Sequence, residues 1–126
     1  MFSHLFLGSN DIDRSKRFYD ATLGVLGCPP GILDPRGRLA YIHDGSVLLF
    51  TRPIDGQPAT HAHGGTLGFV ATSSEQIDAW HAAGVANGGT TCEDPPGVRE
   101  GGMGKMYLAY LRDPDGNKLC GLHRMT

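Results

Sequence analysis

Two side chains near opposite ends of the chain could do chemistry together, the imidazole of His4 and the thiol of Cys120. A protonated imidazole within hydrogen-bond reach of a thiol lowers the thiol pKa and creates a nucleophile. Imidazole and thiolate are also good ligands for zinc. The competing interpretation is structural, because free cysteine is among the most buried residue types and Cys120 would then fill space beside a core histidine. The sequence shows no third group that would orient His4.

Composition restricts the kind of protein that can position these groups. The chain has 126 residues, of which 40% are hydrophobic, enough for one compact domain with a sizeable core. A net charge of −2 argues against a nucleic-acid partner. The sequence contains no apolar run of about 18 residues, so it predicts no membrane span. The first residues lack the pattern of a signal peptide. Cys28, Cys92 and Cys120 form no CxxC pair and are interpreted as free thiols, so we expect a cytoplasmic protein.

The two halves of the chain resemble each other. When His4 is placed over Thr66, SHLFLGSNDIDRSKRFYD lies over GTLGFVATSSEQIDAWHA. Each segment predicts a short strand, a polar cap and an amphipathic helix. Asn10 or Asp11 is expected to cap the first helix, and Ser73, followed by Gln76, is typical of a capping box for the second.

A loop and a hairpin follow each predicted helix. LAYIHDGSVLLF (39–50) matches LAYLRDPDGNKLCG (108–121), with turns at Asp44-Gly45 and at Asp113–Gly116. The intervening RPIDGQPATHAHGG is rich in Pro, Gly and polar residues, as in a linker. The sequence therefore predicts a single α+β domain, 1–126, built from two βαβββ modules. Their expected bounds are 1–52 and 65–126, with the linker at 53–64.

A half-size sheet with one helix cannot enclose a core alone. We therefore expect helices outside and a curved mixed sheet around a central cleft. Side chains alternate between the two faces of a strand, which predicts Leu5 and Leu7 under the first helix. The same alternation leaves a set of residues facing the cleft: His4, Phe6, Gly8, Thr66, Gly68 and Val70. In the hairpins, the corresponding inward pairs are expected to be Tyr41 with Leu49, and Tyr110 with Cys120.

These residues resemble a known superfamily over essentially the whole chain. His4 in the first strand, GSNDIDRSKRFYDATLGVLG, GFVATSSEQIDAWHAAG and the closing YLRDPDGNKLC look like the glyoxalase/bleomycin-resistance/extradiol-dioxygenase superfamily, the vicinal oxygen chelate proteins. The resemblance implies paired βαβββ modules curled around a cleft. In metal-using relatives this cleft holds a divalent ion bound by three or four side chains.

Carried over residue by residue, the resemblance implies four ligand positions: His4, Leu49, Thr66 and Cys120. Relatives with a metal have His or Gln at the first position, Glu or Gln at the second, His at the third and Glu at the fourth. Only His4 fits this pattern, since Leu49 has no donor atom and Thr66 offers a neutral oxygen. Cys120 replaces the usual carboxylate with a soft sulfur. We therefore expect no cofactor, with zinc held by His4 and Cys120 as the alternative.

Further residues could contribute to a site. Tyr41 and Tyr110 could stack on a flat ligand or donate hydrogen bonds, or could be ordinary strand aromatics. The loop TTCEDPPGVREGGMGKM (90–106) could be a lid whose Arg99 meets a carboxylate or phosphate, or a plain connector. The HxH motif at 61–63 could ligate a metal, although solvated linker histidines are the simpler interpretation.

Two functions are compatible with these features. The first is a module that binds a small apolar or aromatic molecule without a metal. The residues expected to contact that molecule are Phe6, Tyr41, Leu49, Thr66, Arg99 and Tyr110. The second is a glyoxalase-like lyase or isomerase, or another enzyme of the superfamily, with His4 and Cys120 as metal ligands or as base and nucleophile. We expect a homodimer, since two-module chains that resemble this one commonly pair.

Overall fold

The computed structural model describes residues 1–125. The first module consists of β1 (Leu5–Gly8), α1 (Ile12–Val25), β2 (Ile32–Leu33), β3 (Leu39–His43) and β4 (Ser46–Thr51). Its sheet has the order β1-β4-β3-β2. Strand β1 runs parallel to β4, and the other neighbours are antiparallel.

The second module begins with β5 (Leu67–Val70) and α2 (Ser74–Ala86) and continues with four strands. These are β6 (Thr90–Thr91), β7 (Gly97–Gly101), β8 (Gly104–Arg112) and β9 (Lys118–Arg124). The sheet order is β5-β9-β8-β6, with β7 also paired to β8. Strand β5 runs parallel to β9, as β1 does to β4. The predicted α+β fold with two modules is confirmed.

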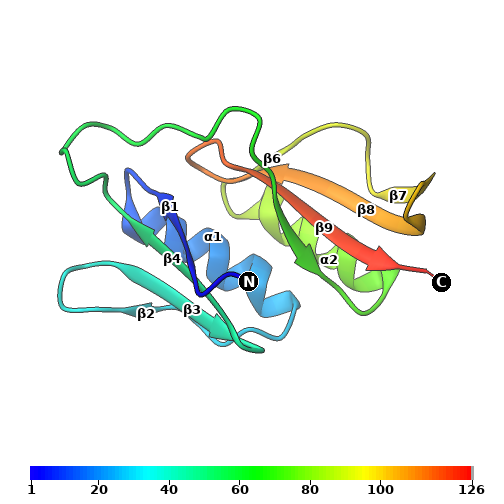
Figure 1. Ribbon diagram of the computed structural model, residues 1–126, viewed down its shortest axis with the longest axis horizontal. Helices are drawn as coiled ribbons and strands as arrows, with labels where there is room; N and C mark the ends of the chain where they lie inside the picture. Colours follow the sequence, from blue (N-terminus) through cyan, green and yellow to red (C-terminus); the bar gives the residue numbers. More distant parts are fainter. Residues whose placement is uncertain (126) are drawn as a thin grey trace.

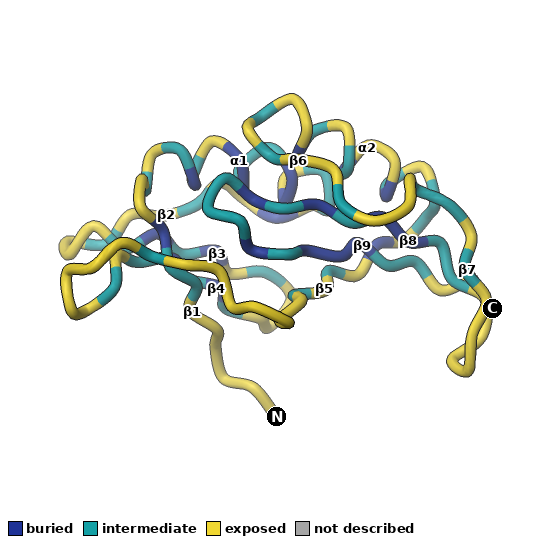
Figure 2. The backbone as a smooth tube through the Cα atoms, turned by 90° about the horizontal axis from the view of Figure 1, so that it is seen from above, coloured by how far each residue is buried: buried dark blue, intermediate teal, exposed yellow. Residues whose placement is uncertain are grey.

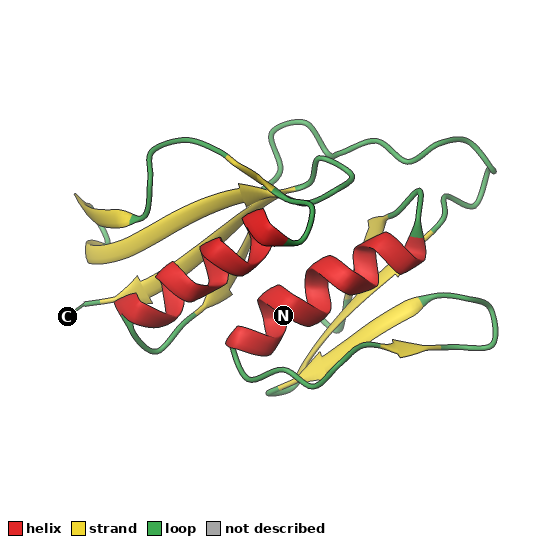
Figure 3. Cartoon of the chain, turned by 180° about the vertical axis from the view of Figure 1, so that it is seen from behind, coloured by secondary structure: helices red, strands yellow, loops and turns green. Residues whose placement is uncertain are grey.

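The two helices lie side by side and cover the same side of both sheets (Figures 1 and 3). Figure 2 shows the N-terminal residues leaving from the opposite side, away from the helices. The core lies between the helices and the sheets, and its largest members are Phe18, Tyr19, Phe50, Ile77 and Trp80. Within residues 1–125, no helix is long and apolar enough to cross a membrane.

Local sequence signals determine where the helices begin. The side chain of Asp11 accepts a hydrogen bond from the backbone of Arg14 and caps α1, and Ser73 does the same for Gln76 in α2. Both predicted caps are confirmed. The Gln76 carboxamide oxygen accepts hydrogen bonds from the backbone and hydroxyl of Thr72 rather than from Ser73. The return contact of the capping box is therefore shifted by one residue.

The glycine-rich segment 90–106 is largely a β-hairpin. Residues 97–101 form β7, which pairs antiparallel with the start of β8 across the turn Gly102-Met103. Gly104, with φ of +95°, supplies a left-handed conformation at this turn. The prediction of a loop is therefore wrong for much of this segment. Glycine disfavours strands, so the glycine content of this segment did not predict one. Pairing with β8 stabilises the strand despite these glycines.

The turn between β8 and β9 fastens the second module to α1 of the first. Asp115 Oδ1 accepts hydrogen bonds from the backbone of Asn10 at 3.0 Å and from the guanidinium of Arg14 at 2.9 Å. Asp115 Oδ2 accepts one from the hydroxyl of Ser15 at 3.3 Å. The Asp115 side chain is only 2% exposed. The predicted hairpin turn is therefore also a joint between the modules.

Asp20, on α1, holds the segment that follows this helix in place through hydrogen bonds. Its Oδ1 accepts hydrogen bonds from the Gly31 backbone at 2.8 Å and the Tyr41 hydroxyl at 2.7 Å, and its Oδ2 accepts one from Lys16 at 2.6 Å. Burial alone would raise the pKa of Asp20, but these donors outweigh it, and the pKa is lowered. Burial, together with the Asp20 carboxylate, raises the pKa of Tyr41, which therefore remains a hydrogen-bond donor.

We expect Asp20→Asn to lower the free energy of unfolding at neutral pH by about 1–2 kcal/mol. Because the pKa of Asp20 is lowered in the folded protein, its contribution is present above the unfolded pKa of about 3.9. The contribution is lost as the pH falls through the folded value. In urea unfolding, the difference between wild type and variant should therefore shrink from neutral pH towards about pH 3. A difference that stays constant contradicts this expectation. The control is Asp55→Asn, at an exposed residue.

Candidate functional site

Strand register decides which side chains can form a site. Leu5 and Leu7 pair with buried residues of β4, which places them on the helix side of the sheet. Leu7 packs against the core, whereas Leu5, at the start of the strand, is 40% exposed. Phe6 pairs with Leu49 on the other side of the same sheet, and His4 follows the same alternation. The predicted orientation of the first strand is confirmed. We call the side of the two sheets that faces away from the helices the open face.

The second sheet follows the same rule. Gly68 pairs with Cys120, and Cys120 pairs with Tyr110, whereas the adjacent Leu119 is fully buried under the helices. Tyr110 and Cys120 therefore share the open face, as predicted. Burial raises the pKa of the Cys120 thiol, which is 7% exposed and remains protonated at neutral pH.

A charged pair lies beside Tyr110 on this face. The Lys118 ammonium lies 5.0 Å from the centre of the Tyr110 ring, within the range of a cation–π contact. Lys118 also forms an ion pair with Glu93. Tyr110 is therefore packed against a cation that is itself neutralised, and its ring is partly covered before any ligand arrives.

Tyr41 does not lie on the open face. It pairs with Leu48 rather than Leu49, its side chain is 3% exposed, and its hydroxyl donates to Asp20. The prediction that Tyr41 faces the cleft is wrong. The two hairpin sequences were aligned by their identical residues, and this alignment set the first hairpin one residue out of register. A shift of one residue moves every side chain of a strand to the other face. Ala40 is the residue that pairs with Leu49.

A pocket of about 560 Å³ opens beside His4, between the start of β1, the start of β4 and β5. The imidazole of His4 is exposed, its Nδ1 lies 2.7 Å from the Ser3 hydroxyl, and its ring meets Phe6 edge-on at 5.7 Å. Thr66 and Gly68 line the side formed by the second module. The polar side chains in the lining are Ser3, His4, Ser46 and Thr66. Both modules therefore contribute to one pocket, with no carboxylate among its described lining residues.

The structure does not bring His4 and Cys120 together in this pocket. Cys120 is not among the described lining residues, and its thiol donates to the Gly121 carbonyl at 3.6 Å. Within residues 1–125, no group of three or more His, Cys, Asp and Glu side chains is placed to hold a metal ion. Leu49 has no donor atom, and Thr66 offers a neutral oxygen. The side chains at the four family positions therefore do not fit a divalent ion.

The remaining sequence candidates lie outside this pocket. Arg99 lies on β7 in register with Met106, on the same face as Tyr110, and its guanidinium donates to the carbonyls of Asp94 and Pro95. The histidines at 61–63 are exposed, with ring centres 6.3 Å apart. Contact of Arg99 with a ligand carboxylate or phosphate stays a prediction.

Sequence reasoning did not identify a second pocket, which lies between the modules on the helix side. Leu26, His43, Phe69 and Gln76 are among the residues that line it. They come from the end of α1, from β3, from β5 and from α2, so no periodicity within one element connects them. Only the packing of α1 against α2 brings these residues together.

The fold makes this chain a two-module α+β protein, with the pocket beside His4 lined by both modules. A family model described as Glyoxalase/Bleomycin resistance protein/Dioxygenase superfamily matches residues 1–120, and the chain belongs to this superfamily. The resemblance deduced from the sequence is confirmed.

Solved structures agree with this assignment. A glyoxalase/bleomycin resistance protein from Albidiferax ferrireducens T118 is 61% identical, with a TM-score of 0.94 and coverage of 98% of this chain and 99% of that one. A glyoxalase-related enzyme from Fulvimarina pelagi has 21% identity and a TM-score of 0.75, with coverage of 98% and 88%. A glyoxalase/bleomycin resistance protein/dioxygenase family enzyme from Burkholderia phytofirmans PsJN has 19% identity and a TM-score of 0.73, with 98% of each chain covered. The last two support the fold alone. A search of curated proteins found no match.

Proposed function

We propose that the protein binds a small, mostly apolar or aromatic molecule in the pocket beside His4, without a metal ion. The observation that carries this proposal is the pocket itself. Its volume of about 560 Å³ lies within the range of about 300–1,000 Å³ that is usual for ligand sites. Its lining is mainly apolar, with a few neutral polar groups that can orient a ligand. His4 and Thr66 are the groups expected to form hydrogen bonds with it.

The alternative is a glyoxalase-like lyase or isomerase that uses His4 and Cys120. The chemistry of such an enzyme needs a metal with several strong ligands, or a thiol that ionises readily. Burial raises the pKa of Cys120 and works against the second route. Within the described chain, the two side chains also lack a shared hydrogen bond. Binding without catalysis therefore has the better support.

A homodimer is part of this proposal. In the sheets formed by residues 1–125, β1 pairs only with β4 and β5 only with β9, so each sheet has an unpaired edge next to the pocket. The open face also exposes Phe6, Ile42 and Val70. A second copy of the chain would cover such a surface. Light scattering tests this, since a dimer has twice the mass of the chain.

A cytoplasmic location is also proposed, because the three cysteines are free.

The binding test uses a variant that fills the pocket. A side chain at Gly68 would meet no atom within 4 Å, and Gly68 has no left-handed backbone, so Gly68→Leu adds apolar volume without strain. Small aromatic compounds are screened by thermal unfolding. A compound at 100 times its Kd stabilises the fold by about 2.7 kcal/mol, or roughly 10 °C. We expect Gly68→Leu to abolish the shift. The matched control is Gly101→Leu, at an equally open position on β7, which should preserve it.

Metal uptake separates the two functions. After incubation with Zn²⁺, Ni²⁺, Mn²⁺ or Fe²⁺ and dialysis, we expect less than about 0.2 equivalents to remain bound. Stoichiometric metal that is lost in both His4→Ala and Cys120→Ser would instead support the enzyme. A screen in which no compound shifts the unfolding temperature, or in which Gly68→Leu binds as well as wild type, contradicts the binding proposal.

A further inference from the structure

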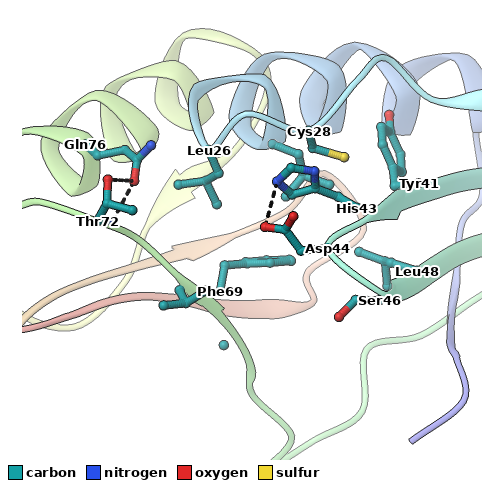
Figure 4. Close-up of a pocket in the computed structure, with 13 residues that line it drawn as sticks. Leu26, Cys28, Tyr41, His43, Asp44, Ser46, Leu48, Phe69, Thr72 and Gln76 are labelled. Carbon is teal, nitrogen blue, oxygen red and sulfur yellow. Dashed lines mark hydrogen bonds and ion pairs between the residues drawn. The ribbon is translucent and has the colours of Figure 1, made fainter.

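The second pocket, which we call the slot, lies between the modules on the helix side of the sheets. Its volume is about 260 Å³. Leu26, from the end of α1, and Phe69, from β5, enter the middle of the slot from opposite sides (Figure 4). A cavity of about 150 Å³ already admits benzene, whereas drug-sized ligands need about 300 Å³ or more. The slot therefore has the size and the apolar middle for one aromatic ring or a small fused ring.

Polar groups lie on two sides of Leu26 and Phe69 (Figure 4). On one side, Gln76 accepts hydrogen bonds from Thr72 and donates from Nε2 to the Val25 carbonyl at 3.0 Å, so its carboxamide is held in one orientation. On the side of Leu26 and Phe69 away from Gln76, Nε2 of His43 lies 3.3 Å from the carboxylate of Asp44. The Asp44 side chain is 88% exposed, which leaves its second oxygen accessible to a ligand.

The charge of the slot selects the kind of ligand. Within the described chain, no lysine or arginine lines it, and Asp44 is its carboxylate. The thiol of Cys28 forms part of the wall. Burial and then the carboxylates of Asp20 and Asp44 raise the pKa of that thiol, so it is a neutral apolar surface and not an anion. An anionic ligand would find no lysine or arginine in this lining and would meet the negative charge of Asp44, whereas a cationic ligand would be attracted to Asp44.

We infer that the slot binds a small flat aromatic molecule that carries a protonated amine. The ring lies between Leu26 and Phe69, and the ammonium donates to the carboxylate of Asp44 beside His43. This site is separate from the pocket beside His4. The two pockets share walls at β4 and β5, but His43, Asp44 and Gln76 line only the slot among the described residues. The inference goes beyond the proposed function and does not depend on it.

The test is a titration followed by amide chemical shifts, with benzylamine, benzyl alcohol and benzoate as probes. We expect benzylamine to bind with a Kd of about 1 mM, as suits a ligand of this size. It should shift the amides of Leu26, His43 and Gln76, which line the slot and not the pocket beside His4. Benzyl alcohol should bind several-fold more weakly than benzylamine, and benzoate should bind least.

Variants locate the binding site without disturbing the fold. Asp44 has φ of +49°, a conformation that asparagine also tolerates, so Asp44→Asn removes the charge at little structural cost. It should weaken benzylamine about two- to fivefold, as expected for an exposed ion pair, and leave benzyl alcohol unchanged. Thr72→Trp, at an exposed residue on the rim of the slot, should block both benzylamine and benzyl alcohol. Val85→Trp, exposed on α2, is its matched control.

Four results would overturn the inference. One is the absence of shifts at the slot with every probe up to about 10 mM. Another is benzoate binding as tightly as benzylamine, and the third is benzylamine binding that Thr72→Trp leaves unchanged. Loss of benzylamine binding in Gly101→Leu or Val85→Trp would have the same meaning, because neither residue lines the slot.

Discussion

Replacing Asp115 with alanine is expected to lower the free energy of unfolding by about 2–4 kcal/mol. The carboxylate is almost fully buried and accepts hydrogen bonds from Arg14 and Ser15, in the first turn of α1, and from Asn10, which precedes the N-cap Asp11. Its negative charge also lies at the N-terminal end of that helix, where the helix dipole favours an anion. Removing it leaves the Asn10 amide and the Arg14 guanidinium without this acceptor.

Urea unfolding of the purified variant measures this loss. Asp115→Asn keeps the shape of the side chain and one acceptor oxygen, so it should fall between wild type and alanine. Asp55→Ala, at an exposed position in the linker, is the matched control and should stay within about 0.5 kcal/mol of wild type. An Asp115→Ala protein as stable as this control would show that the turn does not hold the modules together.

Replacing Phe18 with alanine should have a larger effect, about 3–5 kcal/mol, or a fall of roughly 10–20 °C in Tm. The ring is fully buried and meets Tyr19 edge-on at 4.8 Å. It also reaches the second module, because a Cβ placed on Gly89 would lie 2.5 Å from Cε1 of Phe18. The cavity left by the truncation would therefore open where α1 meets the backbone that follows α2.

Thermal and chemical unfolding measure this effect, and Phe2→Ala is the matched control. It is the same substitution at a side chain that is 89% exposed, and it should change the free energy of unfolding by less than about 0.5 kcal/mol. If Phe18→Ala costs no more than Phe2→Ala, the contact between α1 and the second module does not contribute to stability.

The sequence predicted the features that depend on local chemistry. Asp11 and Ser73 cap the helices because a side-chain oxygen can satisfy a free backbone amide in the first turn. The Asp44-Gly45 turn joins β3 to β4 because both residues adopt positive φ, as its hairpin type requires. Alternation along β1 and β9 correctly placed Phe6 and Cys120.

The predictions failed where register or long-range packing decides the outcome. Tyr41 was assigned to the wrong face because two turns of different length were matched by letters, and pairing partners cannot be read from letters alone. Strand β7 was missed because its ends are glycines, although β8 supplies the partner that stabilises it. The slot could not be anticipated, since Leu26 and Phe69 meet only after the helices pack.

The alternation of the strands separates two kinds of residue along one segment. In β4, Leu48 and Phe50 are buried beneath the helices, whereas Leu49, between them, points to the open face. In β9, Leu119 is likewise buried beneath the helices, whereas Cys120 lies on the open face. Substitutions at 49 or 120 can therefore exchange one chemistry for another while the neighbouring side chains keep the domain folded. In such a scaffold, a donor atom can be added or removed at one open-face position without a change in the side chains that form the core.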